Sequence, residues 1–183
     1  PAVIGIEENK PEAIKAMTTA VAELQASAKG YEGISVMTLK KKYPQGGEKQ
    51  LIDAVMGRQV KSMGLPIDTG AVVQNVGTAL AVYEAVQKNK PLFEGILTVT
   101  GLCSNVQKNY KHRVGTPISK IIEVTGGIPE NAAKVISGGP MMGKALVNTE
   151  VPTAKGSSGI LIMNKKEAKR VEAQTCIRCA KCV

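Results

Sequence analysis

The apolar positions in the first part of the chain follow two different spacings. Residues 3–6 and 34–39 are short, nearly continuous apolar runs, which is typical of strands in a parallel sheet. Between them lies a set of apolar residues at intervals of three and four: Ile14, Met17, Val21 and Leu24. This spacing predicts a helix over residues 11–28, and Pro11 suits its first turn. The order strand, helix, strand predicts a βαβ unit.

A glycine turn follows the second predicted strand and leads into a second predicted helix. Pro44 and the pair Gly46–Gly47 form a tight loop, and residues 48–56 follow with Leu51 and Val55 on the inner face of a helix. A strand, a glycine turn and a helix N-terminus together aim backbone N–H groups at an anion. Four lysines nearby add positive charge: Lys40, Lys41, Lys42 and Lys49. The spacing is neither a Walker A loop nor a GxGxxG fingerprint, so a simple loop remains an equal alternative.

The same layout recurs further along the chain. Residues 71–73 predict a strand, residues 74–77 a polar turn, and residues 78–86 a helix with Thr78 near its cap. Because the carboxyl ends of strands in open α/β sheets carry ligand sites, both turns are expected at one binding edge.

From about residue 92 the pattern changes to a compact α+β module. A strand is predicted in ILTVTG, a proline-started helix at residues 117–125, and a further strand with a glycine turn in AKVISGGPMMG. His112 is expected on the surface of a basic stretch, and Met141 and Met142 in a core or an interface. Residues 153–163 predict a Gly/Ser loop feeding a strand, and residues 164–174 a polar linker or exposed helix.

Three of the four cysteines lie in the last eight residues. Cys176, Cys179 and Cys182 are spaced C-x2-C-x2-C, which matches the first three ligands of a bacterial ferredoxin motif, C-x2-C-x2-C-x3-C-P. A loop of this kind points thiolates at the irons of one cluster, and its backbone N–H groups can bond to the sulfurs. A zinc site is the alternative, but the usual second pair of ligands is missing. Since the fourth cysteine would fall beyond Val183, we expect the chain to be part of a longer protein.

Composition narrows the classes of partner. The formal net charge is +9, from 24 Lys and Arg against 15 Asp and Glu, which suits binding to acidic proteins or to an anionic membrane surface. A solvated surface rich in lysine is the plain alternative. Only 3% of the residues are aromatic, so the stacking platforms of single-strand nucleic-acid binders are missing. We therefore expect no nucleic-acid partner. No apolar run approaches the length of about 20 residues that spans a bilayer.

Six segments in this order resemble one family: KYPQGGEKQLIDAVMGR, VVQNVGTALAVYEAV, HRVGTPISKIIE, ISGGPMMG, KGSSGILIM and CIRCAKC. Together they resemble the C subunit of the Rnf/Rsx ion-translocating electron-transport complex. That family is similar to the flavin subunit of respiratory complex I. The resemblance implies an α/β fold, with a Rossmann-like FMN/NADH-binding domain at residues 1–92. A β-grasp-like SLBB module would follow at residues 93–152. Residues 153–183 would hold a strand, a linker and a truncated 4Fe–4S ferredoxin motif.

The resemblance also implies roles for individual residues. Gly46 and Gly47 would let the flavin or nucleotide approach the backbone, and Glu48 would meet the nicotinamide or its ribose. Lys49 departs from the second Glu of the complex I turn and fits the pattern of the Rnf/Rsx family. Asn75 and Thr78 would bond the FMN phosphate or ring edge. Cys176, Cys179 and Cys182 would bind the first of two 4Fe–4S clusters, whereas Cys103 is expected to be a small core residue. No catalytic residue is implied.

The implied activity is ferredoxin:NAD oxidoreduction coupled to ion translocation, with electrons passing between NAD(H), FMN and 4Fe–4S clusters. The implied partners are the other membrane and peripheral subunits and a ferredoxin-like carrier, at the cytoplasmic face of the bacterial inner membrane. Because the glycine-rich flavin loop of these families is not among the 183 residues, this piece alone is expected to be inactive and to hold neither cofactor tightly. Two alternatives are a soluble relative, such as a cobalamin reductase or a reductase-associated electron carrier, and a non-catalytic partner-binding scaffold.

Overall fold

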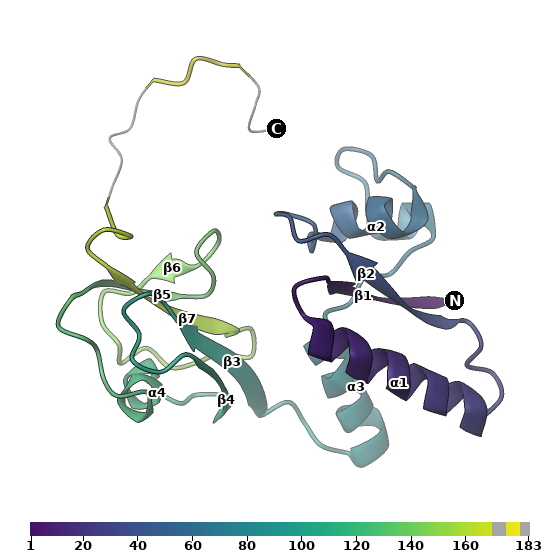
Figure 1. Cartoon of the computed structure of the whole chain (residues 1–183), viewed down its shortest axis with the longest axis horizontal. Coiled ribbons are helices and arrows are strands. Elements are labelled where there is room, and N and C mark those ends of the chain that lie inside the picture. The colour runs from purple at the N-terminus through teal and green to yellow at the C-terminus, as the bar shows by residue number, and fades with distance from the viewer. Residues whose placement is uncertain (170–174, 180–183) are drawn as a thin grey trace. The chain divides into compact units, whose positions relative to one another are not determined.

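The structure is a computed structural model that describes residues 1–169 and 175–179. The chain divides into two compact units, Pro1–Asn75 and Val76–Val183 (Figure 1).

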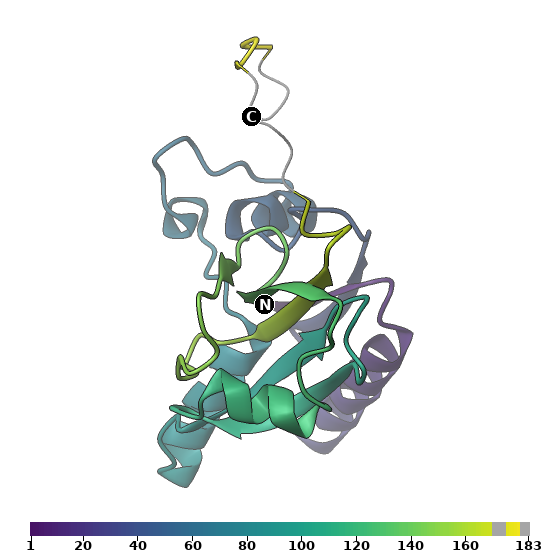
Figure 2. The same ribbon diagram turned by 90° about the vertical axis from the view of Figure 1, so that its left-hand side faces the viewer.

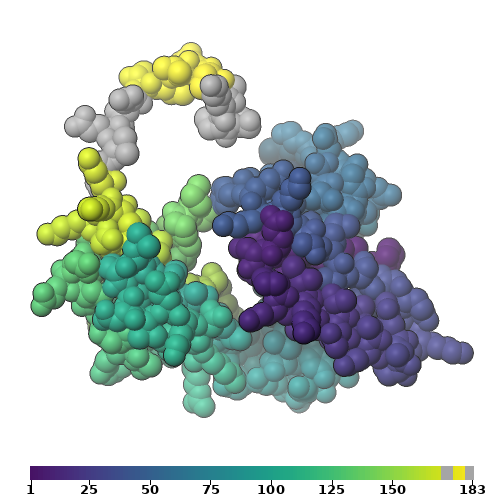
Figure 3. Space-filling view, in the orientation of Figure 1, coloured from purple at the N-terminus to yellow at the C-terminus, as the bar shows by residue number. Residues whose placement is uncertain are grey.

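The first unit contains the predicted βαβ arrangement. Strand β1 (Ala2–Glu7) and strand β2 (Ile34–Leu39) pair in parallel, in a register that runs from Ala2 opposite Ile34 to Glu7 opposite Leu39. Helix α1 (Pro11–Ser27) connects them and begins on its proline. No residue of α1 is buried, and the helix lies at the surface (Figure 3). The apolar residues that predicted the helix, at intervals of three and four, are therefore only partly covered.

Helix α2 (Glu48–Met56) packs against this small sheet at a glycine. A Cβ atom at Gly5 on β1 would come within 2.9 Å of Leu39 Cδ1 and 3.3 Å of Leu51 Cδ1, so these two leucines occupy the space that a larger residue would need. Ile52 is the buried residue of α2, at 2% exposure. Leu51 and Val55, predicted on the inner face, are half-buried. The short 3-10 helix η1 (Pro66–Thr69) follows in the loop after α2.

The predicted strand at residues 71–73 is wrong. Among the described residues the sheet of the first unit has only β1 and β2, and residues 71–75 run outside it with Val72 73% exposed. An apolar triplet becomes a strand only when a sheet edge pairs with its backbone. Instead, Ala71 N–H bonds to the carbonyl of Pro66 and closes the turn of η1. Helix α3 then begins at Val76, so Thr78 lies inside its first turn and not at its cap.

The second unit contains α3 (Val76–Lys88) and a five-stranded sheet in the order β4-β3-β7-β5-β6. The strands are β3 (Glu94–Thr100), β4 (Lys108–Arg113), β5 (Ala132–Ser137), β6 (Lys144–Ala145) and β7 (Gly159–Asn164). Strand β7 pairs in parallel with β3 and antiparallel with β5. Helix α4 (Ile118–Val124) starts after Pro117, as predicted.

Helix α4 lies against one face of this sheet (Figure 2). One hydrophobic core joins the helix to that face. Its buried members are Leu97, Val99, Cys103, Ile118, Ile121, Ile122, Val135, Ile160 and Ile162. Cys103 is a core residue, as predicted, and its Sγ donates a hydrogen bond to the carbonyl of Ile162 at 3.3 Å.

The unit boundaries differ from the predicted domain boundaries. Strand β7, placed by the sequence after a module ending at residue 152, is the central strand of the sheet, with Gly159 opposite Thr98. Helix α3, predicted with the first domain, falls in the second unit. The predicted linker at 164–174 begins as a turn in which Asn164 Oδ1 accepts the N–H groups of Lys166 and Glu167. Residues 170–174 of that linker lie outside the described residues.

One side-chain prediction is wrong, and a second is wrong in one of its two alternatives. His112 is buried, at 7% exposure, because the alternation of β4 turns it inward between the exposed Lys111 and Arg113. Its ring lies over Gly95, the opposite residue on β3, where a Cβ atom would come within 2.9 Å of His112 Cε1. Met141 and Met142 are 67% and 84% exposed, so the core alternative of their prediction is wrong, and the interface alternative stays a prediction.

Candidate functional site

The two glycines before α2 have different surroundings. Gly47 is the N-cap residue and its N–H bonds to the carbonyl of Pro44 at 2.7 Å. A Cβ atom there would meet Gln50 Oε1 at 2.5 Å and the Pro44 carbonyl at 3.0 Å, so a larger residue would require the Gln50 side chain to move. At Gly46 a Cβ atom would meet no atom within 4 Å. The side of the turn that is open to an approaching group is therefore at Gly46.

Glu48 and Lys49 point their charges to different neighbours. Glu48 is exposed in the first turn of α2, where a carboxylate interacts favourably with the positive end of the helix dipole. Lys49 is half-buried, and its Nζ donates to the carbonyl of Lys61 at 3.4 Å in the loop after α2. Lys49 thus ties that loop to the turn, a role that its position in GGEK did not predict.

A hollow of about 520 Å³ lies between the end of β2, the loop before the glycine turn and one side of α2. This volume is in the range of small-molecule sites. Lys40, Lys42 and Tyr43 line it together with Asp53 of α2. Two ammonium groups and a phenol ring suit a ligand that has both an anionic group and a planar ring. The sequence predicted these lysines only as charge near the turn and gave no role to Tyr43, although all three residues lie within the four that follow the predicted strand at 34–39.

A second hollow, of about 260 Å³, brings Glu48 together with the segment that precedes Asn75. Its walls are Glu48, the start of η1 at Leu65–Ile67, and residues 71–74. Asn75 follows directly and is the residue before α3. The first predicted turn and the approach to the second are therefore neighbours within the first unit. Thr78 is exposed and belongs to the second unit.

The cysteine segment has a local geometry suited to a thiolate ligand. The backbone N–H of Arg178 donates to Cys176 Sγ at 3.4 Å, and Arg178 adopts a left-handed conformation with φ of 54°. Cys176 and Cys179 are exposed free thiols, and Cys182 lies outside the described residues. Within residues 1–169 and 175–179, no group of three or more His, Cys, Asp or Glu side chains is arranged to hold a metal ion.

None of the helices in the described part of the chain has the length and apolar character needed to cross a bilayer.

Comparisons with known proteins extend over the whole chain. Residues 1–84 match the family described as the Nuo51 FMN-binding domain. The C subunit of the proton-translocating ferredoxin:NAD(+) oxidoreductase complex of Clostridium ljungdahlii is 45% identical over 100% of this chain and 38% of its own length. The C subunit of the Na(+)-translocating complex of Acetobacterium woodii is 43% identical over 98% of this chain and 39% of its own length.

The chain is homologous over its whole length to these C subunits. The C subunit of the ion-translocating oxidoreductase complex of Rhodobacter capsulatus is also similar, at 38% identity over 98% of this chain and 34% of its own length. The predicted resemblance to the Rnf/Rsx family is therefore confirmed. This C-subunit homologue spans about two fifths of the length of the first two relatives.

A solved structure has a similar fold. The NAD+-reducing [NiFe]-hydrogenase in the H2-reduced state has a chain that matches with a TM-score of 0.60 and 19% identity, over 90% of this chain and 33% of the other. At that identity the likeness concerns the fold. It agrees with the predicted α/β class.

Proposed function

We propose that this C-subunit homologue carries electrons between NAD(H), FMN and 4Fe–4S clusters in a ferredoxin:NAD oxidoreductase complex that translocates ions. The observation that carries the proposal is the identity of 45% with a relative of this family over the whole chain, including both turns and the cysteine segment. The hollows around the first turn support it, because they provide space, positive charge and a carboxylate where a flavin and a nicotinamide nucleotide would need them.

The residues of the first unit fit a nucleotide site in chemical terms. Gly46 leaves the backbone open, so a planar ring or a phosphate can reach the N–H groups at the start of α2. Lys40 and Lys42 would attract phosphate, and the Glu48 carboxylate would accept a hydrogen bond from a ribose hydroxyl or the nicotinamide amide. Asn75, directly before α3, would bond the FMN phosphate or ring edge, with Thr78 in the first turn of the helix.

The bound groups and the protein have separate tasks. FMN supplies the exchange between hydride transfer and single-electron transfer, and the chain binds, orients and shields it. Cys176, Cys179 and Cys182 would hold a 4Fe–4S cluster as thiolates. The bond from Arg178 N–H to Cys176 Sγ supports this assignment, since hydrogen bonds to sulfur stabilise the thiolate and tune the cluster.

The second unit would serve the same transfer of electrons between NAD(H), FMN and 4Fe–4S clusters. We propose that its sheet, from Glu94 to Asn164, is the SLBB module, and that the segment after it is the start of a ferredoxin-type domain. The partners would be the remaining subunits of the complex and a ferredoxin-like carrier. The chain would then lie at the cytoplasmic face of the bacterial inner membrane and associate with it through those subunits.

A flavin spectrum of the full-length protein tests this function. The protein is prepared anaerobically with FMN, and the spectrum is recorded before and after NADH is added. We expect bound flavin whose absorption band bleaches on addition of NADH. Bound flavin that stays oxidised would point to another electron donor, as in soluble relatives such as cobalamin reductases. Lack of any bound flavin would contradict the proposal and favour a scaffold.

A matched pair of variants tests the assignment of Glu48. Glu48→Gln removes the charge at the second hollow, and Glu23→Gln removes one from the exposed face of α1. Loss of a charged hydrogen bond costs about 1.5–3 kcal/mol, so Glu48→Gln should raise the NADH concentration for half-bleaching by roughly 10- to 100-fold. Glu23→Gln should leave it unchanged. Equal behaviour of the two variants would contradict the role given to Glu48.

A further inference from the structure

Helix α3 is attached to the sheet of the second unit with almost no apolar packing. None of its residues is buried, and even its apolar side chains Leu80, Val82 and Val86 are 54%, 56% and 74% exposed. The helix ends at Lys88, Asn89 turns the chain with φ of 53°, and β3 begins at Glu94. The orientation of α3 to the sheet therefore depends on the polar contacts between the helix, this short connection and the strands.

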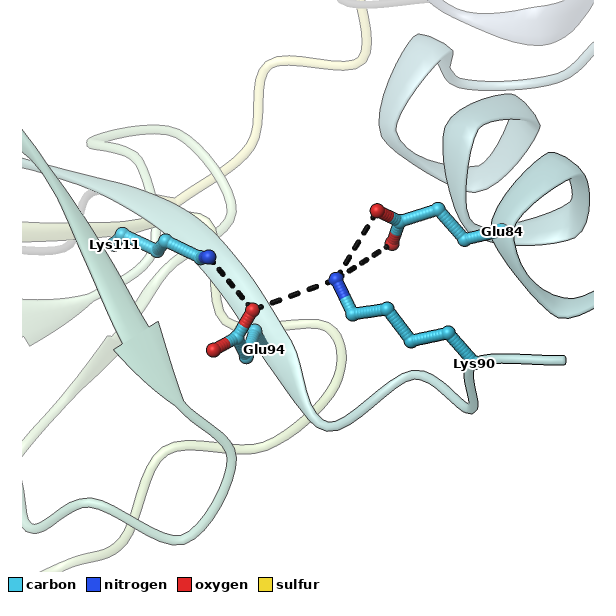
Figure 4. A network of polar contacts seen from close by, with 4 residues as sticks. All are labelled: Glu84, Lys90, Glu94 and Lys111. Atoms are coloured by element: carbon cyan, nitrogen blue, oxygen red, sulfur yellow. Dashed lines mark hydrogen bonds and ion pairs between the residues drawn. The ribbon is translucent and has the colours of Figure 1, made fainter. Parts of the chain in front are cut away.

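A chain of alternating charges crosses the connection (Figure 4). Lys90 Nζ donates to both carboxylate oxygens of Glu84 on α3, at 3.0 and 3.1 Å, and lies 3.5 Å from Glu94 Oε2 on β3. Lys111 on β4 completes the series at 2.7 Å from the same Glu94 oxygen. Two carboxylates and two ammonium groups thus join the helix, the connection and two strands.

Lys90 is the member that links the two sides. Its ammonium contacts carboxylates on both the helix and the sheet, and its Nζ lies over the ring of Phe93, 5.5 Å from the ring centre. Its backbone N–H also bonds to the carbonyl of Glu84 at 3.1 Å. The side chains of Lys90, Glu84 and Glu94 are only 31%, 25% and 20% exposed, so solvent screens them less than an isolated surface pair.

The charge states of the network agree with this geometry. The hydrogen bond to Glu84 raises the pKa of Lys90 above its usual value. The hydrogen bond from Lys111 is the main cause that lowers the pKa of Glu94 below its usual value. A carboxylate of this kind contributes stability above its unfolded pKa and loses it as the pH falls through the lowered value. Both shifts favour the charged forms of Lys90 and Glu94.

We propose that Lys90 is a positioning residue, whose ion pairs with Glu84 and Glu94 hold helix α3 in a fixed orientation on the β3–β4 edge of the sheet. The first turn of this helix carries Thr78, and Asn75 directly precedes it. Resting on the proposed function, the network then sets where the flavin-binding end of α3 points from the sheet. Because the link is electrostatic, salt loosens it.

Amide hydrogen exchange of the full-length protein tests the link without any cofactor. The variants are Lys90→Met, its conservative counterpart Lys90→Arg, and the control Lys88→Met. Lys88 is a matched control because its Nζ also lies near an aromatic ring, 5.1 Å from the centre of Tyr83, and forms no pair in the network. The readout is exchange in peptides covering residues 76–93, at about 0.05 and about 1 M NaCl, between which the Debye length falls from more than about 10 Å to about 3 Å.

We expect Lys90→Met to exchange about two- to fivefold faster than the natural chain at low salt, in line with the modest strength of partly exposed ion pairs. The natural chain should approach the variant at high salt, and Lys90→Arg should restore slow exchange. Natural exchange in Lys90→Met, or equal acceleration by Lys88→Met, would overturn the proposal.

FMN titration of the same variants separates the link from the proposed function. Lys90→Met should weaken FMN binding by about two- to fivefold, with recovery in Lys90→Arg, because positioning through the network can transmit no more than the ion pairs contribute. If the natural protein binds no FMN, the proposed function fails while the exchange result still decides the link. If FMN affinity does not change in Lys90→Met although exchange does, the positioning role is overturned.

Discussion

The two units of this chain differ in how much they bury and how much charge they carry. In the described part of the first unit the buried residues are Leu39, Gln45 and Ile52, around a two-stranded sheet. The second unit has a core of nine buried residues between α4 and a five-stranded sheet. A two-stranded ribbon is marginal by itself, so the second unit is expected to be the more stable.

The charge is divided in the same way. Residues 1–75 contain nine Lys and Arg against eight Asp and Glu, whereas residues 76–183 contain fifteen against seven. The positive surface that would attract acidic partners therefore belongs almost entirely to the second unit. The first unit carries the hollows, and sites for ligands are often found in the less stable part of a protein. The first unit is thus distinguished by its hollows, and the second by its larger core and its positive charge.

The largest effect that would separate the units is expected from Gly101→Ala. Gly101 has φ of 137°, and an added Cβ atom would fall on the carbonyl oxygen of Ile162 in the central strand. Backbone strain and overpacking together should lower the free energy of unfolding of the second unit by about 3–5 kcal/mol. Urea denaturation followed by circular dichroism measures the loss.

The matched control for this change is Gly139→Ala in the turn after β5. A Cβ atom there would meet no atom within 4 Å. The control should shift the free energy of unfolding by less than about 1 kcal/mol. A loss as large as that of Gly101→Ala would mean that the contact with Ile162 does not limit this position.

The second prediction compares one core residue from each unit. Ile162 is fully buried in the second unit, and Ile52 is 2% exposed in the first. Removing either side chain in Ile162→Ala or Ile52→Ala should cost about 2–5 kcal/mol locally. Amide hydrogen exchange should place the loss in residues 94–164 for Ile162→Ala, and in residues 1–75 for Ile52→Ala. If both variants lose protection throughout the chain, the two units unfold as one and the comparison fails.

The sequence predicted most of the regular elements of both units. Strand Ile34–Leu39 and helix Glu48–Met56 have the predicted bounds. A short apolar run between two turns is a strong local signal for a strand, and apolar residues at helical spacing after a glycine turn are one for a helix. The strand at residues 71–73 failed because three apolar residues do not specify a pairing partner. Likewise, no local signal shows that β7 inserts between β3 and β5, since this is decided by long-range pairing.

The candidate site was predictable in part. Glu48 and the segment before Asn75 do share a hollow, but the predicted reason is wrong, because residues 71–73 form no strand that ends at the same sheet edge. The ring of Tyr43 at the larger hollow and the bond of Lys49 to the Lys61 carbonyl were not predicted, because they depend on the path of irregular loops. His112 was misjudged because a charged stretch suggests a surface, whereas strand alternation places every second residue inside.

The smallest predicted effect concerns His112. It tests whether the buried imidazole makes a polar contact that stabilises the second unit. Both ring nitrogens are buried without a hydrogen-bond partner in the described residues, and a buried polar group left unpaired costs about 1–3 kcal/mol. His112→Leu should therefore leave the free energy of unfolding unchanged or raise it by about 1 kcal/mol, whereas His112→Ala should lower it by about 2 kcal/mol through the cavity above Gly95. Thermal and urea unfolding of the two variants measure the difference. A loss in His112→Leu as large as that in His112→Ala would show that the imidazole is bonded in solution, for example to a buried water, and that the second unit's core includes a polar contact that contributes to its stability.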